Sequence, residues 1–362
     1  MALWAPATDA DTVQGVPARF VASPASTEEA AAVVTAARDL TIVVRGGATK
    51  LDWGLPPRHV DLIIDTRRLT GVVEHAAGDL ITVVRAGTPL STLDFGTQQL
   101  ALDDPLPGAT VGGTVAADTS GPRRMLYGTA RDLLIGITVV RPDGTVTRAG
   151  GKVVKNVAGY DLGKLYTGSY GTLGLITECV FRLHPVPRAR AFVTVPVSGL
   201  DAQLAAVRAE QVVPSAVEFD GYSATLAVLV EGTPDGVRDR AARLEKVLGG
   251  SCSPEPPPWF GRYPWEPGGT GVKIGVPLSA IASLPGPVRG SAGTGVLYSH
   301  LPGLREAAHR AGGHAVVLTA PAAVRQRVDM WGPVPGLELM RRVKDQFDPG
   351  HRFAPGRFVG GI

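Results

Sequence analysis

The fold is decided by a glycine-rich stretch, Arg45–Lys50 (Arg-Gly-Gly-Ala-Thr-Lys), together with three more that follow it. Residues 40–45 are rich in β-formers, so this loop comes directly after a predicted strand. Successive glycines let backbone N–H groups point into one concavity, which suits a phosphate or pyrophosphate. The stretch is neither a Walker A loop nor a G-x-G-x-x-G motif. Taken alone, it fits a tight turn as well as an anion site.

Three further stretches of small residues follow in the first half of the chain. The second, Pro107–Pro122, mixes glycine and alanine with hydroxyls. A long ligand can lie against such bare backbone, and the helix that it opens can present N-terminal amides to an anion; a close-packed helix is the alternative. The third is Tyr127–Asp132. The fourth is Gly150–Asp161, continued by Gly168–Ile176, where a Gly-Thr-Leu-Gly turn offers backbone groups to a heteroaromatic edge.

Composition and charge are those of a soluble globular enzyme. The 362 residues are 44% hydrophobic and 19% charged, with a net charge of +3 and no basic tract, which excludes a nucleic-acid-binding role. The two cysteines, Cys179 and Cys252, cannot build a zinc site or an iron–sulfur cluster, and they fit a reducing compartment. No signal peptide or membrane-spanning run is evident. We therefore expect a cytoplasmic protein that reaches the inner face of a membrane only through partners.

Local patterns predict an α+β chain. Residues 26–39 have a capping residue followed by acidic residues and an alanine-rich apolar stripe, which indicates a helix. Residues 72–86 and 132–148 each have two β-rich runs around a turn, which indicates two hairpins. Residues 91–100 are also predicted to be helical.

A change in composition marks the domain boundary. The proline-bearing stretch 184–187 is predicted to leave the first domain. After it, strand–helix–strand–strand–helix patterns suggest half of a ferredoxin-like sandwich. The sequence therefore predicts a first domain over 1–187, a smaller domain over 188–334, and a C-terminal segment, 335–362, that returns to the first domain.

The four glycine-rich stretches, in this order and spacing, resemble the FAD-binding domain of the vanillyl-alcohol oxidase / para-cresol methylhydroxylase (PCMH) superfamily. Within it, Ser120–Arg124 and Lys155–Asp161 look like signatures of the E subunit of bacterial glycolate oxidase. The stronger match covers about residues 40–187, and a weaker one covers 347–350 and 355–357. The resemblance implies a PCMH-type FAD-binding domain of two α+β subdomains with a smaller ferredoxin-like α+β cap.

The resemblance also implies which residues bind the cofactor. The first loop would wrap the FAD pyrophosphate, the second stretch would line the pyrophosphate and ribityl path, and the last turn would lie toward the adenine. The implied residues are Arg45, Gly46, Gly47, Ala48, Thr49, Lys50, Pro107, Gly108, Ala109, Thr110, Val111, Gly112, Gly113, Thr114, Ser120, Gly121, Gly128, Gly171, Thr172, Gly174 and Ile176.

The sequence departs from relatives of this superfamily in three ways. Some attach the flavin through a histidine in the first loop, where this chain has Ala48 and Thr49, so non-covalent FAD is expected. Many end in Asn-Pro-Gly-Lys/Arg, where this chain has Ala354 in place of the asparagine. The catalytic dehydrogenases carry a metal-binding His-x-His element, and no such pair occurs among these seven histidines. No metal site is therefore expected; His309 and His314 are separated by a helix-breaking Gly-Gly.

Candidate catalytic residues are few. Arg123 and Arg124 have the chemistry to clamp a substrate carboxylate, but they fit equally well over a flavin phosphate or against a partner subunit. His300 follows a predicted strand and can face the flavin or simply end that strand. Residues 256–269 form a proline-rich loop with Trp259, Tyr263 and Trp265, for which a lid or subunit contact is favoured over a mobile loop.

The resemblance leads to three functional hypotheses. The first is an FAD-binding subunit of a glycolate oxidase complex, in which a larger flavoprotein subunit oxidises glycolate and an iron–sulfur subunit carries the electrons onward. The second is a self-sufficient FAD-dependent dehydrogenase of a small 2-hydroxy acid of the D-lactate type. The third is an assembly subunit that holds FAD without turnover. No catalytic base can be named from the sequence, which favours an accessory role.

Overall fold

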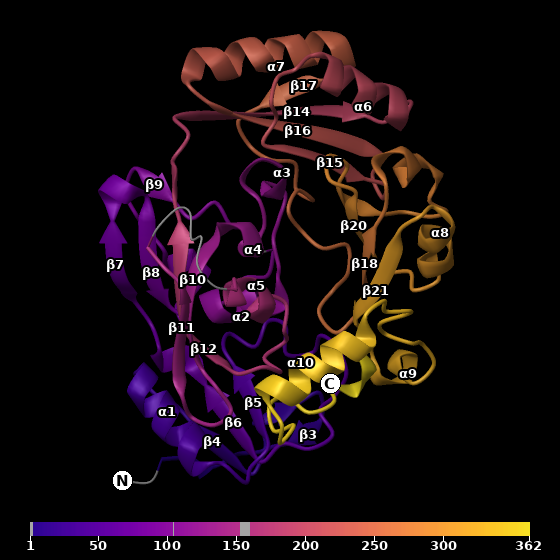
Figure 1. Cartoon of the computed structure of the whole chain (residues 1–362). Coiled ribbons are helices and arrows are strands. Elements are labelled where there is room, and N and C mark those ends of the chain that lie inside the picture. Colours follow the sequence, from indigo (N-terminus) through magenta and orange to yellow (C-terminus); the bar gives the residue numbers. More distant parts are fainter. Residues whose placement is uncertain (1–2, 104, 153–159) are drawn as a thin grey trace. The chain divides into compact units, whose positions relative to one another are not determined.

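The computed structural model describes residues 3–103, 105–152 and 160–362, which form two compact units (Figure 1). The first unit comprises Met1–Thr119, Thr129–Pro185 and Pro333–Ile362, and the second comprises Ser120–Gly128 and Val186–Gly332. The short segment Ser120–Gly128, which the sequence places in the first domain, therefore packs with the second unit.

The first unit begins with a mixed four-stranded sheet in the order β1-β4-β6-β5. Its strands are β1 (Ala5–Pro6), β4 (Phe20–Ala22), β6 (Leu62–Asp65) and β5 (Ile42–Arg45), and a small hairpin joins β2 (Thr12–Val13) to β3 (Val16–Pro17). Helix α1 (Thr27–Ala36) is capped as the sequence predicts, because Ser26 Oγ accepts a hydrogen bond from the Glu29 N–H at 3.1 Å. Its apolar side buries Ala30, Val33 and Val34 against Ile42 and Leu62.

A five-stranded antiparallel sheet forms the rest of this unit, in the order β11-β10-β12-β8-β7. Its strands are β7 (Val72–Ala76), β8 (Ile81–Arg85), β10 (Leu134–Val140), β11 (Val146–Gly150) and β12 (Leu175–Arg182). Both predicted hairpins are present, as β7–β8 and β10–β11. Three short helices complete the unit, namely α2 (Val111–Ala117), α4 (Ala130–Leu133) and α5 (Leu162–Tyr166). Contacts of α2 with β8 and β12, and of α5 with β10, position the loops of the site.

The helix predicted over residues 91–100 is wrong. The structure has a 3₁₀ turn over Leu90–Thr92, and then β9 (Gln98–Gln99), which pairs with β13 (His184–Pro185). Gly96 takes a left-handed conformation with φ +65°, and its N–H donates to Asp94 Oδ1 at 2.9 Å. This local turn is incompatible with a continuous helix.

The second unit is built on an eight-stranded antiparallel sheet in the order β17-β14-β16-β15-β19-β20-β18-β21. The strands are β14 (Ala189–Pro196), β15 (Ala216–Asp220), β16 (Thr225–Gly232), β17 (Ser251–Ser253), β18 (Gly271–Gly275), β19 (Arg289–Ser291), β20 (Val296–Ser299) and β21 (His314–Thr319). Its helices are α3 (Arg124–Tyr127), α6 (Leu200–Ala209), α7 (Pro234–Leu248), α8 (Leu304–Arg310) and α9 (Ala322–Arg325). Figure 1 shows α6 and α7 over one face of the sheet, so the predicted strand–helix–strand–strand–helix order is present.

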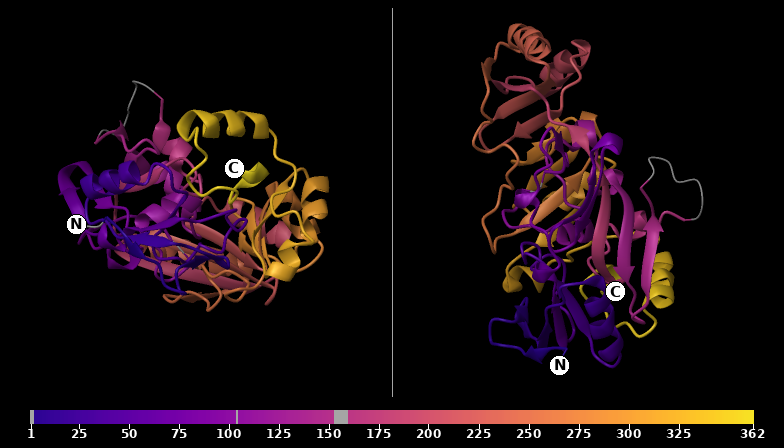
Figure 2. Two further views of the ribbon diagram at one scale, coloured as in Figure 1. Left: turned by 90° about the horizontal axis from the view of Figure 1, so that it is seen from below. Right: turned by 90° about the vertical axis from the view of Figure 1, so that its left-hand side faces the viewer.

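The C-terminal segment returns to the first unit. Helix α10 (Leu337–Phe347) is followed by residues that lie beside the N-terminal strands, where Ile42 forms a parallel bridge with Phe353 (Figure 2). The Ala354 N–H donates to the Ile42 carbonyl at 2.7 Å. Within the described ranges, no helix is long and apolar enough to cross a membrane.

Candidate functional site

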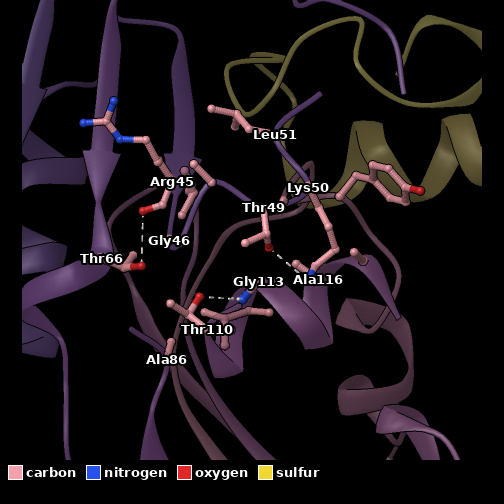
Figure 3. A pocket seen from close by; sticks show the side chains of 18 of the residues that line it. Arg45, Gly46, Thr49, Lys50, Leu51, Thr66, Ala86, Thr110, Gly113 and Ala116 are labelled. Atoms are coloured by element: carbon pink, nitrogen blue, oxygen red, sulfur yellow. Dashed lines mark hydrogen bonds between the residues drawn. The ribbon is translucent and has the colours of Figure 1, made fainter. Parts of the chain in front are cut away.

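A pocket in the first unit gathers residues from three of the sequence segments that were singled out (Figure 3). Its wall combines the loop after β5, the first turns of α2, and the turn that leads into β12. Of the residues that the sequence predicts, the pocket is lined by Arg45, Gly46, Gly47, Ala48, Thr49, Lys50, Thr110, Gly112, Gly113, Gly171, Gly174 and Ile176.

The loop after β5 offers unused backbone donors to this pocket. Within the described part of the chain, the N–H groups of Gly47, Ala48 and Thr49 donate no hydrogen bond. The Lys50 ammonium contacts Thr49 Oγ1 at 3.3 Å on the same wall (Figure 3). Successive amides that point to one side, beside a cation, form a site for an anion. The loop therefore has the chemistry that its glycines predict.

The glycines of this loop also allow the two main segments of the wall to meet. A Cβ on Gly47 would lie 1.9 Å from the Gly108 carbonyl oxygen, and one on Gly46 would lie 2.3 Å from Thr110 Oγ1. In the same way, a Cβ on Gly112 would lie 2.7 Å from the Cβ of Ala86. The small residues are thus required because the loop, α2 and the end of β8 approach each other at backbone distance.

The N-terminal amides of α2 do not serve as the expected anion donors. The Val111 N–H donates to the Thr88 carbonyl at 2.9 Å, and the Gly112 N–H donates to the Ala86 carbonyl at 2.7 Å. The Gly113 N–H donates to the capping hydroxyl of Thr110 at 3.4 Å (Figure 3). These donors hold the helix against the residues that follow β8, so the anion-binding amides of the site are those of the first loop.

Arg45 has a structural role in this loop. Its guanidinium donates to Asp65 Oδ2 at 3.0 and 3.1 Å and to Asp11 Oδ1 at 2.8 Å. Arg67 holds the same Asp65, and together with Arg45 it lowers the pKa of that carboxyl although burial opposes the shift. The Thr66 hydroxyl, which is part of the pocket, donates to the Arg45 carbonyl at 3.2 Å. The network fixes the point at which β5 becomes the loop.

Nine of the predicted cofactor residues do not line the pocket. Pro107, Gly108 and Ala109 precede α2, and Gly108 and Ala109 approach Gly47 of the first loop instead. Val111, Thr114 and Thr172 are buried in the protein interior. Ser120, Gly121 and Gly128 belong to the second unit.

Eight residues of the wall were not predicted. Most are small or apolar and carry no signal of their own, whereas Arg357 belongs to the C-terminal Pro-Gly-Arg motif that the sequence does display. These residues are Val44, Leu51, Thr66, Ala86, Ala116, Ala117, Tyr170 and Arg357.

The candidate catalytic residues all belong to the second unit. Arg124 donates through Nε to the Gly121 carbonyl at 3.0 Å, and through Nη2 to the Ser120 carbonyl and to Tyr298 Oη, the latter at 2.9 Å. Arg123 lies 4.0 Å from Glu231 Oε1. His300 is exposed, and its Nδ1 lies 2.9 Å from Tyr222 Oη. The Arg124 contacts fix Ser120–Gly128 on the sheet, which is a structural use of that guanidinium.

The aromatic loop packs against its own sheet. Tyr263 and Trp265 stack at 4.5 Å, and Tyr298 meets Tyr263 edge-on at 4.8 Å. Phe260 packs edge-on against Phe192 of β14 at 5.1 Å. The loop is therefore ordered by contacts within the second unit.

Two other sequence observations can be placed. Ala354 is buried and has φ +47°, a left-handed conformation that asparagine or glycine adopts more readily, so the substituted motif position is conformationally special. The signature stretch Lys155–Gly159 lies outside the described residues. Among the residues that are described, no three His, Cys, Asp or Glu side chains gather in a way that could hold a metal ion.

Comparison with known proteins identifies the domain. Residues 18–150 match the FAD binding domain family. The chain is 40% identical over 154 residues to glycolate oxidase subunit GlcE of Escherichia coli, which covers 41% of this chain and 43% of that protein. It is 35% identical over 207 residues to D-lactate dehydrogenase of Archaeoglobus fulgidus, with 55% and 46% covered. The chain thus spans about half the length of the curated relatives that it matches.

The fold has solved counterparts. The structure of p-cresol methylhydroxylase with bound substrate superimposes with a TM-score of 0.71 at 16% identity, over 94% of this chain and 89% of that one. The pocket fits a dinucleotide, because the amides of Gly47, Ala48 and Thr49 offer donors to a diphosphate. Three cationic residues, Arg45, Lys50 and Arg357, line the same pocket. Residues 18–150 are therefore an FAD-binding domain, the chain shares its fold with p-cresol methylhydroxylase, and FAD is its cofactor.

Proposed function

We propose that this chain is the FAD-binding subunit of a glycolate oxidase complex, in which glycolate is oxidised to glyoxylate and electrons pass to an iron–sulfur partner. The observation that carries the proposal is the 40% identity to glycolate oxidase subunit GlcE. A second relative, glycolate oxidase subunit GlcD of Bacillus subtilis, is 31% identical over 209 residues. The likeness to two subunits of that name supports assembly with a larger flavoprotein.

In this proposal, the contribution of this chain to the reaction is a pocket that binds FAD. Bound FAD would provide the hydride acceptor for oxidation of the hydroxyl-bearing carbon. The loop residues Gly47–Thr49 would bind the FAD diphosphate through their backbone amides, and Lys50 would add a positive charge on the same wall. We propose that attachment is non-covalent, since Ala48 and Thr49 occupy the loop and neither can form a histidyl bond to a flavin.

The test is the visible spectrum of the purified chain before and after anaerobic addition of glycolate or D-lactate. We expect a flavin spectrum that the substrates alone do not bleach. Bleaching should begin only when the partner subunits, which are expressed together, are added to the purified chain. An unbleached flavin in the reconstituted complex would contradict the proposal. Release of the flavin by acid precipitation would check that attachment is non-covalent.

A second function is favoured by a longer overlap. The match to the D-lactate dehydrogenase of A. fulgidus covers 55% of this chain, compared with 41% for the GlcE match. A self-sufficient FAD-dependent dehydrogenase of a 2-hydroxy acid is therefore the alternative. Bleaching of the isolated chain by D-lactate or glycolate, without any partner, would establish it in place of the subunit role.

A further inference from the structure

The C-terminal segment contributes one charged residue to the cofactor pocket. Arg357 lines the pocket, yet it lies about 300 residues after the glycine-rich loop in the sequence. Its Nη2 donates to the Leu51 carbonyl at 2.6 Å and to the Trp53 carbonyl at 2.9 Å. Arg357 therefore fixes the chain directly after the three unpaired amides of the first loop.

One buried donor of this guanidinium has no acceptor among the described residues. The side chain is buried, with Arg357 only 4% exposed, and its Nε–H has no hydrogen-bond partner among the described residues. No carboxylate in the described part of the chain forms a salt bridge with it. A buried charged donor without an acceptor costs stability, because nothing replaces the water that it has lost.

The electrostatic surroundings agree with this picture. Burial lowers the pKa of Arg357 to about 10, although Tyr170 and Asp52 oppose the shift. An anion in the pocket would compensate for this burial. The Tyr170 ring, which lines the same pocket, stacks on Phe358 with ring centroids 5.1 Å apart, and this contact fixes its position.

We infer that Arg357 is a cofactor-binding residue whose guanidinium donates to the FAD diphosphate, while its Nη2 holds the loop that presents the amides of Gly47, Ala48 and Thr49. The C-terminal segment is therefore a wall of the FAD site. Two backbone hydrogen bonds join it to the residues that follow the first loop. The Leu55 N–H donates to the Arg357 carbonyl at 3.0 Å, and the Arg58 N–H donates to the Pro355 carbonyl at 2.9 Å. Cofactor binding and docking of this segment are coupled through one guanidinium.

The experiment compares Arg357→Met with the matched control Arg352→Met. Arg352 is an arginine of the same segment that donates to the carbonyls of Leu40, Ala37 and Pro142 and does not line the pocket. Binding of FAD and of ADP to the deflavinated full chain is measured by fluorescence titration and calorimetry. ADP carries the adenine and a diphosphate but no flavin, so it reports on the diphosphate contact alone.

We expect Arg357→Met to weaken FAD and ADP alike by about tenfold to a hundredfold, as for loss of a hydrogen bond to a charged group. Arg352→Met should leave both dissociation constants within about threefold of those of the unaltered chain. Equal weakening by the two variants, or unchanged FAD binding in Arg357→Met, would overturn the inference. Weakening of FAD without weakening of ADP would also overturn it, because the contact would then be with the flavin.

A second variant covers the case in which Arg357→Met does not fold. Arg357→Lys keeps the positive charge, but a single ammonium cannot both hold the loop carbonyls and reach the diphosphate. We expect it to fold and to bind FAD and ADP about threefold to tenfold more weakly. FAD binding equal to that of the unaltered chain would contradict the assignment, since either contact would then be dispensable.

Discussion

Lys344 and Asp348 form an ion pair in the interior of the first unit. Lys344 Nζ lies 2.6 Å from Asp348 Oδ2, and each side chain is 1% exposed. The same ammonium donates to the carbonyls of Thr172 at 2.7 Å and Phe353 at 2.9 Å, and Asp348 Oδ2 accepts the Phe353 N–H at 2.8 Å. The pair therefore joins α10 to the turn before β12 and to the C-terminal residues.

Replacement of Lys344 by methionine should destabilise the protein strongly. The change leaves a buried carboxylate without its cation, which costs about 3–5 kcal/mol of the free energy of unfolding. Denaturant-induced unfolding of the FAD-free chain measures the loss. Arg341→Met is the control, because its pair with Glu338 lies on the exposed side of the same helix and is worth less than about 1 kcal/mol. Equal losses in both variants would contradict the structural role of the buried pair.

The stability contributed by Asp11 should disappear in acid. Hydrogen bonds from the Thr8 N–H and hydroxyl, followed by that from Arg45, lower the pKa of Asp11 to about 2. Because the pKa is lower in the folded state than the ~3.9 of an unfolded chain, this stability is present above pH ~4 and is lost as the pH falls toward 2. Asp11→Asn should cost about 1 kcal/mol near pH 6 and clearly less at pH 3, measured by urea unfolding at each pH. A loss independent of pH would contradict the assignment.

Gly47→Ala should damage the cofactor site. Its Cβ would lie 1.9 Å from the Gly108 carbonyl oxygen, so the loop must move away from the segment that precedes α2. We expect FAD to bind at least about tenfold more weakly, since the displaced amides no longer converge on the diphosphate. Titration with FAD checks the result. Gly78→Ala, at a turn where a Cβ meets nothing within 4 Å, should leave FAD binding unchanged.

Ala48→Gly should stabilise the protein slightly. Ala48 is exposed and has φ +60°, a left-handed conformation that costs a residue with a Cβ about 1–2 kcal/mol relative to glycine. Part of the gain is offset by the greater freedom of glycine in the unfolded chain, so a net increase of about 0.5 kcal/mol is expected. Thermal unfolding measures it. The same substitution at Ala32, which is exposed within α1, should instead destabilise by about 1 kcal/mol.

The sequence predicts correctly those elements that are determined by residues within or next to them. The cap at Ser26 and the turn at 142–144 lie within a few residues of what they shape, and the structure has both. The helix over 91–100 fails because one glycine, Gly96, takes a left-handed turn that an apolar pattern cannot reveal.

The site was predictable only in part, for the same reason. The loop Arg45–Lys50 displays its function in its own composition. The amides of α2 are consumed by Ala86 and Thr88, which lie more than 20 residues away along the chain. Arg357 reaches the pocket only through the tertiary fold, so its motif could be noticed in the sequence but its place beside the first loop could not.

The discontinuous composition of the first unit has a consequence for biosynthesis. Residues 333–362 supply Lys344, Phe353 and Arg357 to a core whose other parts end at Pro185. Residues 186–332, which make up most of the second unit, are translated in between. During synthesis, the first unit therefore has an incomplete core and an incomplete pocket wall. It can finish folding only after residues 333–362 have followed the second unit off the ribosome. FAD capture should consequently follow the synthesis of residues 186–332.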